Sequence, residues 1–126
     1  MFINKLIEKA KEDKKTICLV ESDDLRVLKA ASIVKKMDFA NIILIGNEKK
    51  INDFASSNNV DIKDIKIINP LNSDLTDLLI QKFYEIRKDK GLSFNEAQDI
   101  IKNDYLYFGD MLVYLNYADG LVAGAN

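Results

Sequence analysis

The sequence reads Thr-Ile-Cys-Leu-Val at residues 16–20 and Asn-Ile-Ile-Leu-Ile at residues 41–45. Continuous apolar runs of this kind are typical of strands that are buried on both faces of a parallel sheet. Residues 23–37, between the two runs, have apolar residues at helical spacing, which predicts a helix. Its expected inner face carries Val27, Ala30, Ala31 and Val34. Two parallel strands joined by a helix form the βαβ unit from which α/β folds are built.

The rest of the sequence continues this alternation of helices and strands. Residues 66–68 predict a third strand, and residues 120–125 predict a last one after an Asp-Gly turn. Ser93 followed by Glu96 is a capping box, which marks the start of a helix. Apolar residues at helical spacing predict helices around residues 2–10, 51–55, 75–86, 93–101 and 105–115.

From the first strand onward, the order β-α-β-α-β-α-α-α-β predicts an α/β protein in three layers. A mostly parallel sheet is then covered by helices on both faces. A chain of 126 residues with 48% hydrophobic residues can bury one core, so we expect a single domain over residues 1–126. The apolar strand at residues 120–125 belongs inside a sheet, with chain continuing beyond it. We therefore expect the front part of a larger enzyme, truncated before most of its reacting groups.

The composition narrows the partners and the cellular location. The 18 Lys and Arg residues nearly balance 20 Asp and Glu residues, and the net charge of −2 argues against nucleic acid or an anionic membrane as the main partner. No apolar run approaches the roughly 20 residues that span a bilayer. The N-terminus lacks the features of a signal peptide, and the lone Cys18 leaves no internal disulfide, so we expect a cytoplasmic protein. With no His and one Cys, the sequence offers no His-based triad and no usual zinc pattern, and we expect no metal.

The first candidate site is the loop at residues 21–26, Glu-Ser-Asp-Asp-Leu-Arg, which follows the first strand. Open α/β sheets bind ligands at the carboxyl ends of their strands, so Glu21, Ser22 and Arg26 are candidate ligand contacts. The alternative is that Ser22 or Asp23 caps the following helix. Capping explains every residue of the loop except Arg26, and the loop lacks the glycines of a nucleotide-binding fingerprint.

Two further segments are candidate sites. Arg87, Lys88 and Lys90 crowd the end of a helix, where cations either interact with the helix dipole in solvent or meet an anionic ligand. Arginine offers a bidentate fork to phosphate. Near the end of the chain, Gly124 and the small residues around it permit a ligand or a neighbouring backbone to approach closely. A tightly packed core strand is the alternative there.

Four stretches of the sequence, the last of them in two parts, resemble in order the N-terminal portion of one enzyme family. Residues 26–31 read Arg-Val-Leu-Lys-Ala-Ala, residues 42–47 read Ile-Ile-Leu-Ile-Gly-Asn, and residues 83–91 read Phe-Tyr-Glu-Ile-Arg-Lys-Asp-Lys-Gly. Residues 107–113 read Tyr-Phe-Gly-Asp-Met-Leu-Val, and residues 118–125 read Ala-Asp-Gly-Leu-Val-Ala-Gly-Ala. The first three stretches are similar to E-R-V-L-K-A-A, P-I-L-L-G-N and F-Y-E-L-R-K-K-K-G of phosphate acetyltransferase (phosphotransacetylase). The two parts of the last stretch are similar to Y-F-G-T-M-M-V followed by A-D-G-M-V-S-G-A of the same family. The likeness covers nearly the whole chain.

The resemblance implies a two-domain fold of the isocitrate/isopropylmalate dehydrogenase-like kind, of which this chain is the incomplete first domain. The family moves an acetyl group between coenzyme A and phosphate, so that acetyl-CoA and phosphate give acetyl phosphate and CoA. Coenzyme A is a substrate there, and no cofactor is implied. The family's catalytic groups lie downstream, so none falls in this chain, and the fragment alone is expected to be inactive. Only Arg87 carries over, as a contact to a phosphate of coenzyme A.

Departures from the family pattern keep other possibilities open. Val20-Glu21-Ser22 stands where the family has P-E-G, and Ala123 stands where it has a serine. A sister phosphate acyltransferase, or the related domain fused to some malic enzymes, also fits. A phospho-receiver signalling domain is the alternative from another class. It requires an Asp after the third strand, where this chain has Asn69. Because a bare sheet edge or an apolar patch favours association, we expect a homo-oligomer.

Overall fold

The computed structural model describes residues 12–124, and a four-stranded sheet lies at its centre. The strands are β1 (Lys15–Leu19), β2 (Ala40–Ile45), β3 (Lys66–Ile68) and β4 (Gly120–Val122). All of them pair in parallel, in the order β3-β2-β1-β4. The predicted parallel α/β sheet is thereby confirmed. The helix predicted at residues 2–10 lies outside the described residues.

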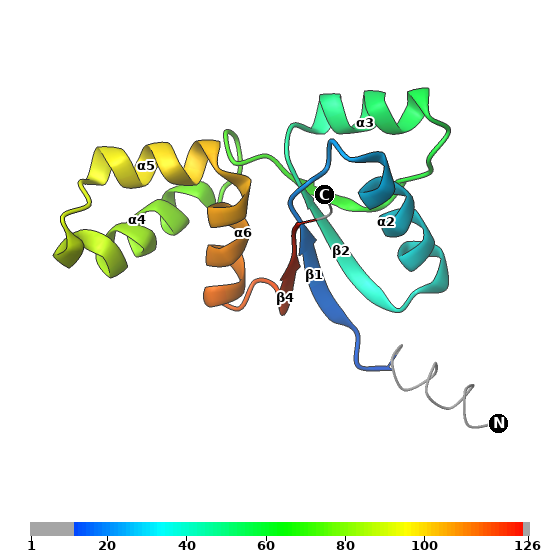
Figure 1. Ribbon diagram of the computed structural model, residues 1–126. Helices are drawn as coiled ribbons and strands as arrows, with labels where there is room; N and C mark the ends of the chain where they lie inside the picture. Colours follow the sequence, from blue (N-terminus) through cyan, green and yellow to red (C-terminus); the bar gives the residue numbers. More distant parts are fainter. Residues whose placement is uncertain (1–11, 125–126) are drawn as a thin grey trace.

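Five α-helices and one short 3₁₀ helix connect the strands. They are α2 (Leu25–Met37), α3 (Glu48–Ser57), α4 (Thr76–Arg87), the 3₁₀ helix η1 (Lys88–Lys90), α5 (Phe94–Asn103) and α6 (Tyr105–Tyr114). Figure 1 shows α2 and α3 on one side of the sheet, and α4, α5 and α6 on the other. The element order and the three layers are those predicted from the sequence.

The apolar runs of β1 and β2 fill the core on both faces because successive side chains of a strand point to opposite sides. Cys18, Ile43 and Ile45 belong to the core cluster beneath α4, α5 and α6. Their neighbours Leu19, Ile42 and Leu44 belong to the cluster beneath α2 and α3. A continuous apolar sequence is therefore required here, as predicted.

The inner face of α2 differs in part from the prediction. Leu28 and Ala31 are fully buried and Ser32 is nearly so, whereas Ala30 is exposed. The helix begins after Asp24, which accepts a hydrogen bond from the backbone N–H of Arg26. With the helix starting there, Leu28 and the residues three and four positions after it face the sheet. This arrangement buries a leucine, which contributes more apolar area than the alanine at position 30 would.

Helices α4 and α5 form a hairpin that extends away from the sheet in Figure 1, with residues 88–92 at its tip. Gly91 ends η1 with φ of 89°, a left-handed conformation that favours glycine. The predicted capping box starts α5: Ser93 Oγ accepts from the Glu96 backbone N–H at 3.1 Å, and Glu96 Oε1 accepts from the Ser93 backbone N–H at 3.0 Å. These two caps fix the turn between the two helices.

The strand order places a topological switch between β1 and β4. The connections from β1 to β2 and from β2 to β3 step to one side, and the connection from β3 crosses back to the other side of β1. In open α/β sheets the loops diverge at such a point, and ligands bind outside the carboxyl ends of the strands there. The loops that follow β1 and β4 are therefore where a site is expected.

Candidate functional site

The loops after β1 and β4 are joined directly at the switch point. The backbone N–H of Gly124 donates to Glu21 Oε1 at 2.9 Å. The two residues are 103 positions apart in the sequence, yet β1 and β4 pair in parallel and end at the same edge of the sheet. The structure thus brings together Glu21 and Gly124, two of the predicted site residues.

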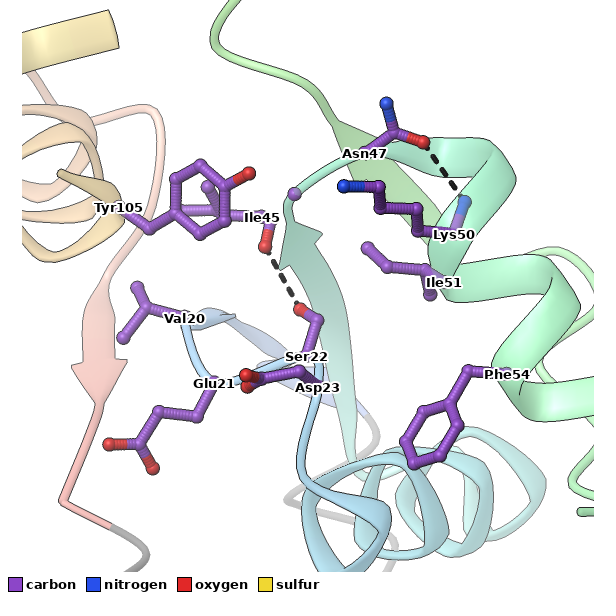
Figure 2. A pocket seen from close by; sticks show the side chains of 11 residues that line it. Val20, Glu21, Ser22, Asp23, Ile45, Asn47, Lys50, Ile51, Phe54 and Tyr105 are labelled. Carbon is purple, nitrogen blue, oxygen red and sulfur yellow. Dashed lines mark hydrogen bonds between the residues drawn. The ribbon is translucent and has the colours of Figure 1, made fainter. Parts of the chain in front are cut away.

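A cavity of about 560 Å³ lies beside this junction, at the carboxyl ends of β1 and β2. Its volume is in the range of small-molecule pockets. Figure 2 shows Tyr105 of α6 and Phe54 of α3 on opposite sides of it. The residues that line the cavity are Val20, Glu21, Ser22, Asp23, Ile45, Gly46, Asn47, Lys50, Ile51, Phe54 and Tyr105. The cavity therefore has apolar and aromatic walls with a few polar groups, the usual composition of a ligand site.

Ser22 lies in this cavity wall but has a structural partner. Its side chain is buried, and its hydroxyl donates to the Ile45 carbonyl oxygen at 2.9 Å, as the dashed line in Figure 2 shows. The bond ties the loop after β1 to the end of β2. The alternative that Ser22 or Asp23 caps α2 is wrong, because Asp24 is the N-cap. Ser22 cannot serve as that cap while its hydroxyl is directed at the neighbouring strand.

Arg26 lies outside the cavity lining and is paired with the N-cap of its own helix. Its Nη2 lies 2.7 Å from Asp24 Oδ2 and its Nε 3.1 Å from Asp24 Oδ1. These bonds lower the pKa of Asp24 and raise the pKa of Arg26, to which the nearby Glu21 carboxylate adds. The edge of the guanidinium that carries Nε and Nη2 is thus engaged. The structure does not place Arg26 with Ser22 in the cavity.

The loop after β2 supplies cavity residues that were not among the candidates from the sequence. Asn47 caps α3, its Oδ1 accepting from the Lys50 backbone N–H at 2.9 Å. A Cβ on Gly46 would lie 3.0 Å from Ile51 Cδ1 and 3.6 Å from Tyr105 Cε2, so a side chain here would crowd the cavity. The sequence carried a signal for these cavity residues: Gly46-Asn47 directly follows an apolar run, which is a pattern that combines a strand end with a helix N-cap.

Arg87 is separated from the cavity. It ends α4 at the tip of the hairpin, it is exposed, and no residue of α4 or α5 lines the cavity. Its guanidinium carbon lies 5.5 Å from the centre of the Phe83 ring. Within residues 12–124 it forms no ion pair, and Lys88 and Lys90 beside it are also exposed. The hairpin tip is therefore a second, cationic candidate site.

Other kinds of site find little support in the part of the chain that the structure describes. No group of three or more His, Cys, Asp or Glu residues there comes together in a way that could hold a metal ion. Among residues 12–124, no helix is both long and apolar enough to cross a membrane. Burial raises the pKa of the Cys18 thiol to about 11, so this side chain is not a thiolate at neutral pH.

Comparison with known proteins gives one consistent result. The family model for phosphate acetyl/butaryl transferase matches residues 1–126. The chain is 46% identical over 124 residues to a phosphate acetyltransferase of Acetivibrio thermocellus, covering 98% of this chain and 36% of that protein. It is 46% identical over 123 residues to one of Thermoanaerobacterium thermosaccharolyticum, covering 98% of this chain and 37% of that protein. A solved EutD phosphotransacetylase from Staphylococcus aureus superimposes with a TM-score of 0.85 at 38% identity, covering 98% of this chain and 38% of that one.

The comparisons also decide between the classes considered from the sequence. The chain spans slightly more than a third of the length of the curated relatives it matches. The phospho-receiver alternative is wrong, since the family that matches is an acyltransferase family. In agreement, Asn69 after β3 is buried and its amide donates to Glu48 Oε1 at 2.9 Å, where a receiver would need a reactive carboxylate.

Proposed function

Because the chain belongs to the phosphate acetyl/butaryl transferase family, we propose that it forms part of an enzyme that exchanges an acetyl group between coenzyme A and phosphate. The observation that carries the proposal is the match over residues 1–126 together with relatives named phosphate acetyltransferase at 46% identity. In this reaction the thiolate of coenzyme A attacks the carbonyl carbon of acetyl phosphate, phosphate leaves, and the thioester acetyl-CoA forms. In the reverse direction phosphate attacks the thioester.

The proposed contribution of this chain is substrate binding. We assign Arg87 to a phosphate group of coenzyme A. Its exposed guanidinium, without an ion pair among residues 12–124, supports this assignment, and so do the neighbouring Lys88 and Lys90. Charge-assisted bonds from an arginine fork to phosphate are among the strong hydrogen bonds in proteins. No catalytic residue is assigned to this chain, because the catalytic groups that the resemblance implies lie downstream of it.

For the loops at the switch point we propose a supporting role. The bonds from Gly124 to Glu21 and from Ser22 to Ile45 hold the ends of β1, β2 and β4 together at the cavity. Fixed loops at the carboxyl edge of a rigid sheet are what an α/β enzyme needs in order to position a substrate. Substrate contacts by Glu21, Ser22, Arg26 and Gly124 themselves remain predictions.

Partners and location are likewise proposed. We expect a cytoplasmic homo-oligomer without nucleic-acid or membrane partners and without a cofactor. Exposed apolar side chains on α2, Ile33 at 57% and Met37 at 46%, support association, as does Val122 at 55% on the edge strand β4. Light scattering of the purified chain at several concentrations tests this. A monomer at every concentration would contradict the proposal.

A segment exchange tests the function. Residues 1–126 of this chain replace the matching segment of the Acetivibrio thermocellus phosphate acetyltransferase, and thioester formation is followed from acetyl phosphate and coenzyme A. We expect the chimera to be active and the isolated chain to show no turnover. A folded chimera without activity would contradict the proposal, and so would turnover by the chain alone above that of a mock preparation.

Arg87→Ala in the chimera tests the binding assignment. Losing an arginine–phosphate contact costs about 1.5–3 kcal/mol, so KM for coenzyme A should rise roughly ten- to a hundredfold while kcat changes little. Dephospho-coenzyme A, which lacks the 3′-phosphate, should be used about equally by the two proteins if that group is the partner. Lys29→Ala, at an exposed position of α2 on the other side of the sheet, is the matched control for loss of one positive charge. An unchanged KM in Arg87→Ala would make Arg87 an ordinary solvated cation.

A further inference from the structure

We propose that Phe83 is a positioning residue that holds the Arg87 guanidinium ready for a phosphate group. This inference rests on the proposed function. Phe83 lies one turn before Arg87 on α4, and the guanidinium carbon lies 5.5 Å from the centre of its ring. This distance is within the range of a cation–π interaction, in which the negative face of the ring attracts the cation.

The Phe83 ring is itself held firmly. Its side chain is only 4% exposed and belongs to the core cluster between α4, α5, α6 and the sheet. Tyr107 of α6 meets it edge to face, with ring centres 5.5 Å apart and planes at 62°. The ring therefore connects the packed interior to the exposed Arg87 at the hairpin tip. An arginine on the surface acquires a fixed support from the core.

The two arginines of this sequence show why the kind of partner matters. Arg26 donates from Nε and Nη2 to Asp24, so its fork is occupied by a carboxylate. Arg87 lies over a ring face, which attracts the cation without accepting its in-plane N–H groups. Its fork is thus held in place and remains open. Ordering a long side chain in advance removes part of the entropy lost when a ligand binds.

The ligand chemistry that fits this arrangement is a phosphate monoester. The planar fork matches two oxygens of one phosphate, and the exposed Lys88 and Lys90 next to it add positive charge to the same tip. In the proposed function this group belongs to coenzyme A.

Side-chain order is the direct test, measured on the chain itself by ¹⁵N relaxation of the Arg87 Nε–Hε group. Pentafluorophenylalanine at position 83 keeps an aromatic ring of similar shape but inverts its quadrupole, and Phe83→Leu removes the ring. We expect the wild-type order parameter of Arg87 to lie above about 0.6 and to fall below it in both variants. Phe108→Leu, at a fully buried ring of the same core cluster, is the matched control and should leave Arg87 ordered. A mobile Arg87 in the wild type, or an unchanged order parameter in the pentafluoro variant, would overturn the inference.

A titration with coenzyme A separates this inference from the proposed function. We follow the same Nε–Hε signal and expect the pentafluoro variant to bind about two- to fivefold more weakly than the wild type, the range of an exposed cation–π contact. With dephospho-coenzyme A the two proteins should be equal. A wild-type Arg87 signal that is ordered but does not respond to coenzyme A would contradict the assigned role in substrate binding while leaving the positioning by Phe83 intact. An equal response in both proteins would reject the positioning instead.

Discussion

Gly109 is the position at which one added methyl group should have the clearest structural consequence. It is buried in α6, and a Cβ there would lie 2.7 Å from Leu121 Cδ1, 3.1 Å from Val20 Cγ1 and 3.3 Å from Ile45 Cδ1. Contacts below 3.0 Å require a neighbour to move. Gly109 therefore allows α6 to approach β1, β2 and β4 closely.

Two opposing effects set the size of the change in Gly109→Ala. Alanine is favoured over glycine inside a helix by about 1 kcal/mol. Overpacking a core by a methyl group costs about 1–3 kcal/mol. Since three side chains crowd the new Cβ, overpacking should dominate, and we expect a net loss of roughly 0–2 kcal/mol in the free energy of unfolding. Equilibrium urea unfolding of the purified chain measures it.

The double variant Gly109→Ala with Leu121→Ala decides whether the reasoning is right. Removing Leu121 Cδ1 eliminates the shortest contact, so the added methyl should then be neutral or stabilising. We expect a coupling free energy of about 1–2 kcal/mol between the two sites. Asp110→Ala, at an exposed position of α6, is the control for helix propensity alone. Strictly additive effects of Gly109→Ala and Leu121→Ala would refute the packing argument.

Three further predictions concern single side chains. Ser22→Ala removes the buried hydroxyl that donates to the Ile45 carbonyl, so the free energy of unfolding should fall by about 1–3 kcal/mol; a loss near zero in urea unfolding would mean that this hydrogen bond does not contribute to stability. Cys18 is fully buried with a pKa raised to about 11, so a thiol reagent at pH 8 should label it only in denaturant, and rapid labelling of the native chain would contradict its burial. The Ser93 backbone N–H lowers the pKa of Glu96. The stabilisation by this hydrogen bond should therefore be present above the pKa that Glu96 has in the unfolded chain, and it should disappear as the pH falls through the pKa of Glu96 in the folded chain. The stability difference between wild type and Glu96→Gln should therefore shrink on acidification from pH 7, and a constant difference would contradict this.

Local signals in the sequence were sufficient wherever a few neighbouring residues set the outcome. The strand at residues 66–68 is observed with the predicted bounds, because Lys66–Ile68 ends at a polar turn. The capping box at Ser93 and Glu96 is also as predicted, since its partners are three residues apart. The cap of α2 was predicted wrongly, because Ser22, Asp23 and Asp24 are all competent caps. The neighbouring β2, whose Ile45 carbonyl accepts from the Ser22 hydroxyl, excludes Ser22, and this contact cannot be inferred from the local sequence.

The sequence by itself determined the α/β class, the element order and the family, because apolar periodicity and motif stretches are properties of the chain read in order. Tertiary structure alone decided which predicted site residues meet. It joins Glu21 to Gly124 across 103 residues, ties the Ser22 hydroxyl to Ile45 on the neighbouring strand, and leaves Arg87 on a hairpin away from the cavity. The physical reason is that strand order and helix packing fix these distances. They depend on contacts between segments far apart in the chain, which local propensity does not encode.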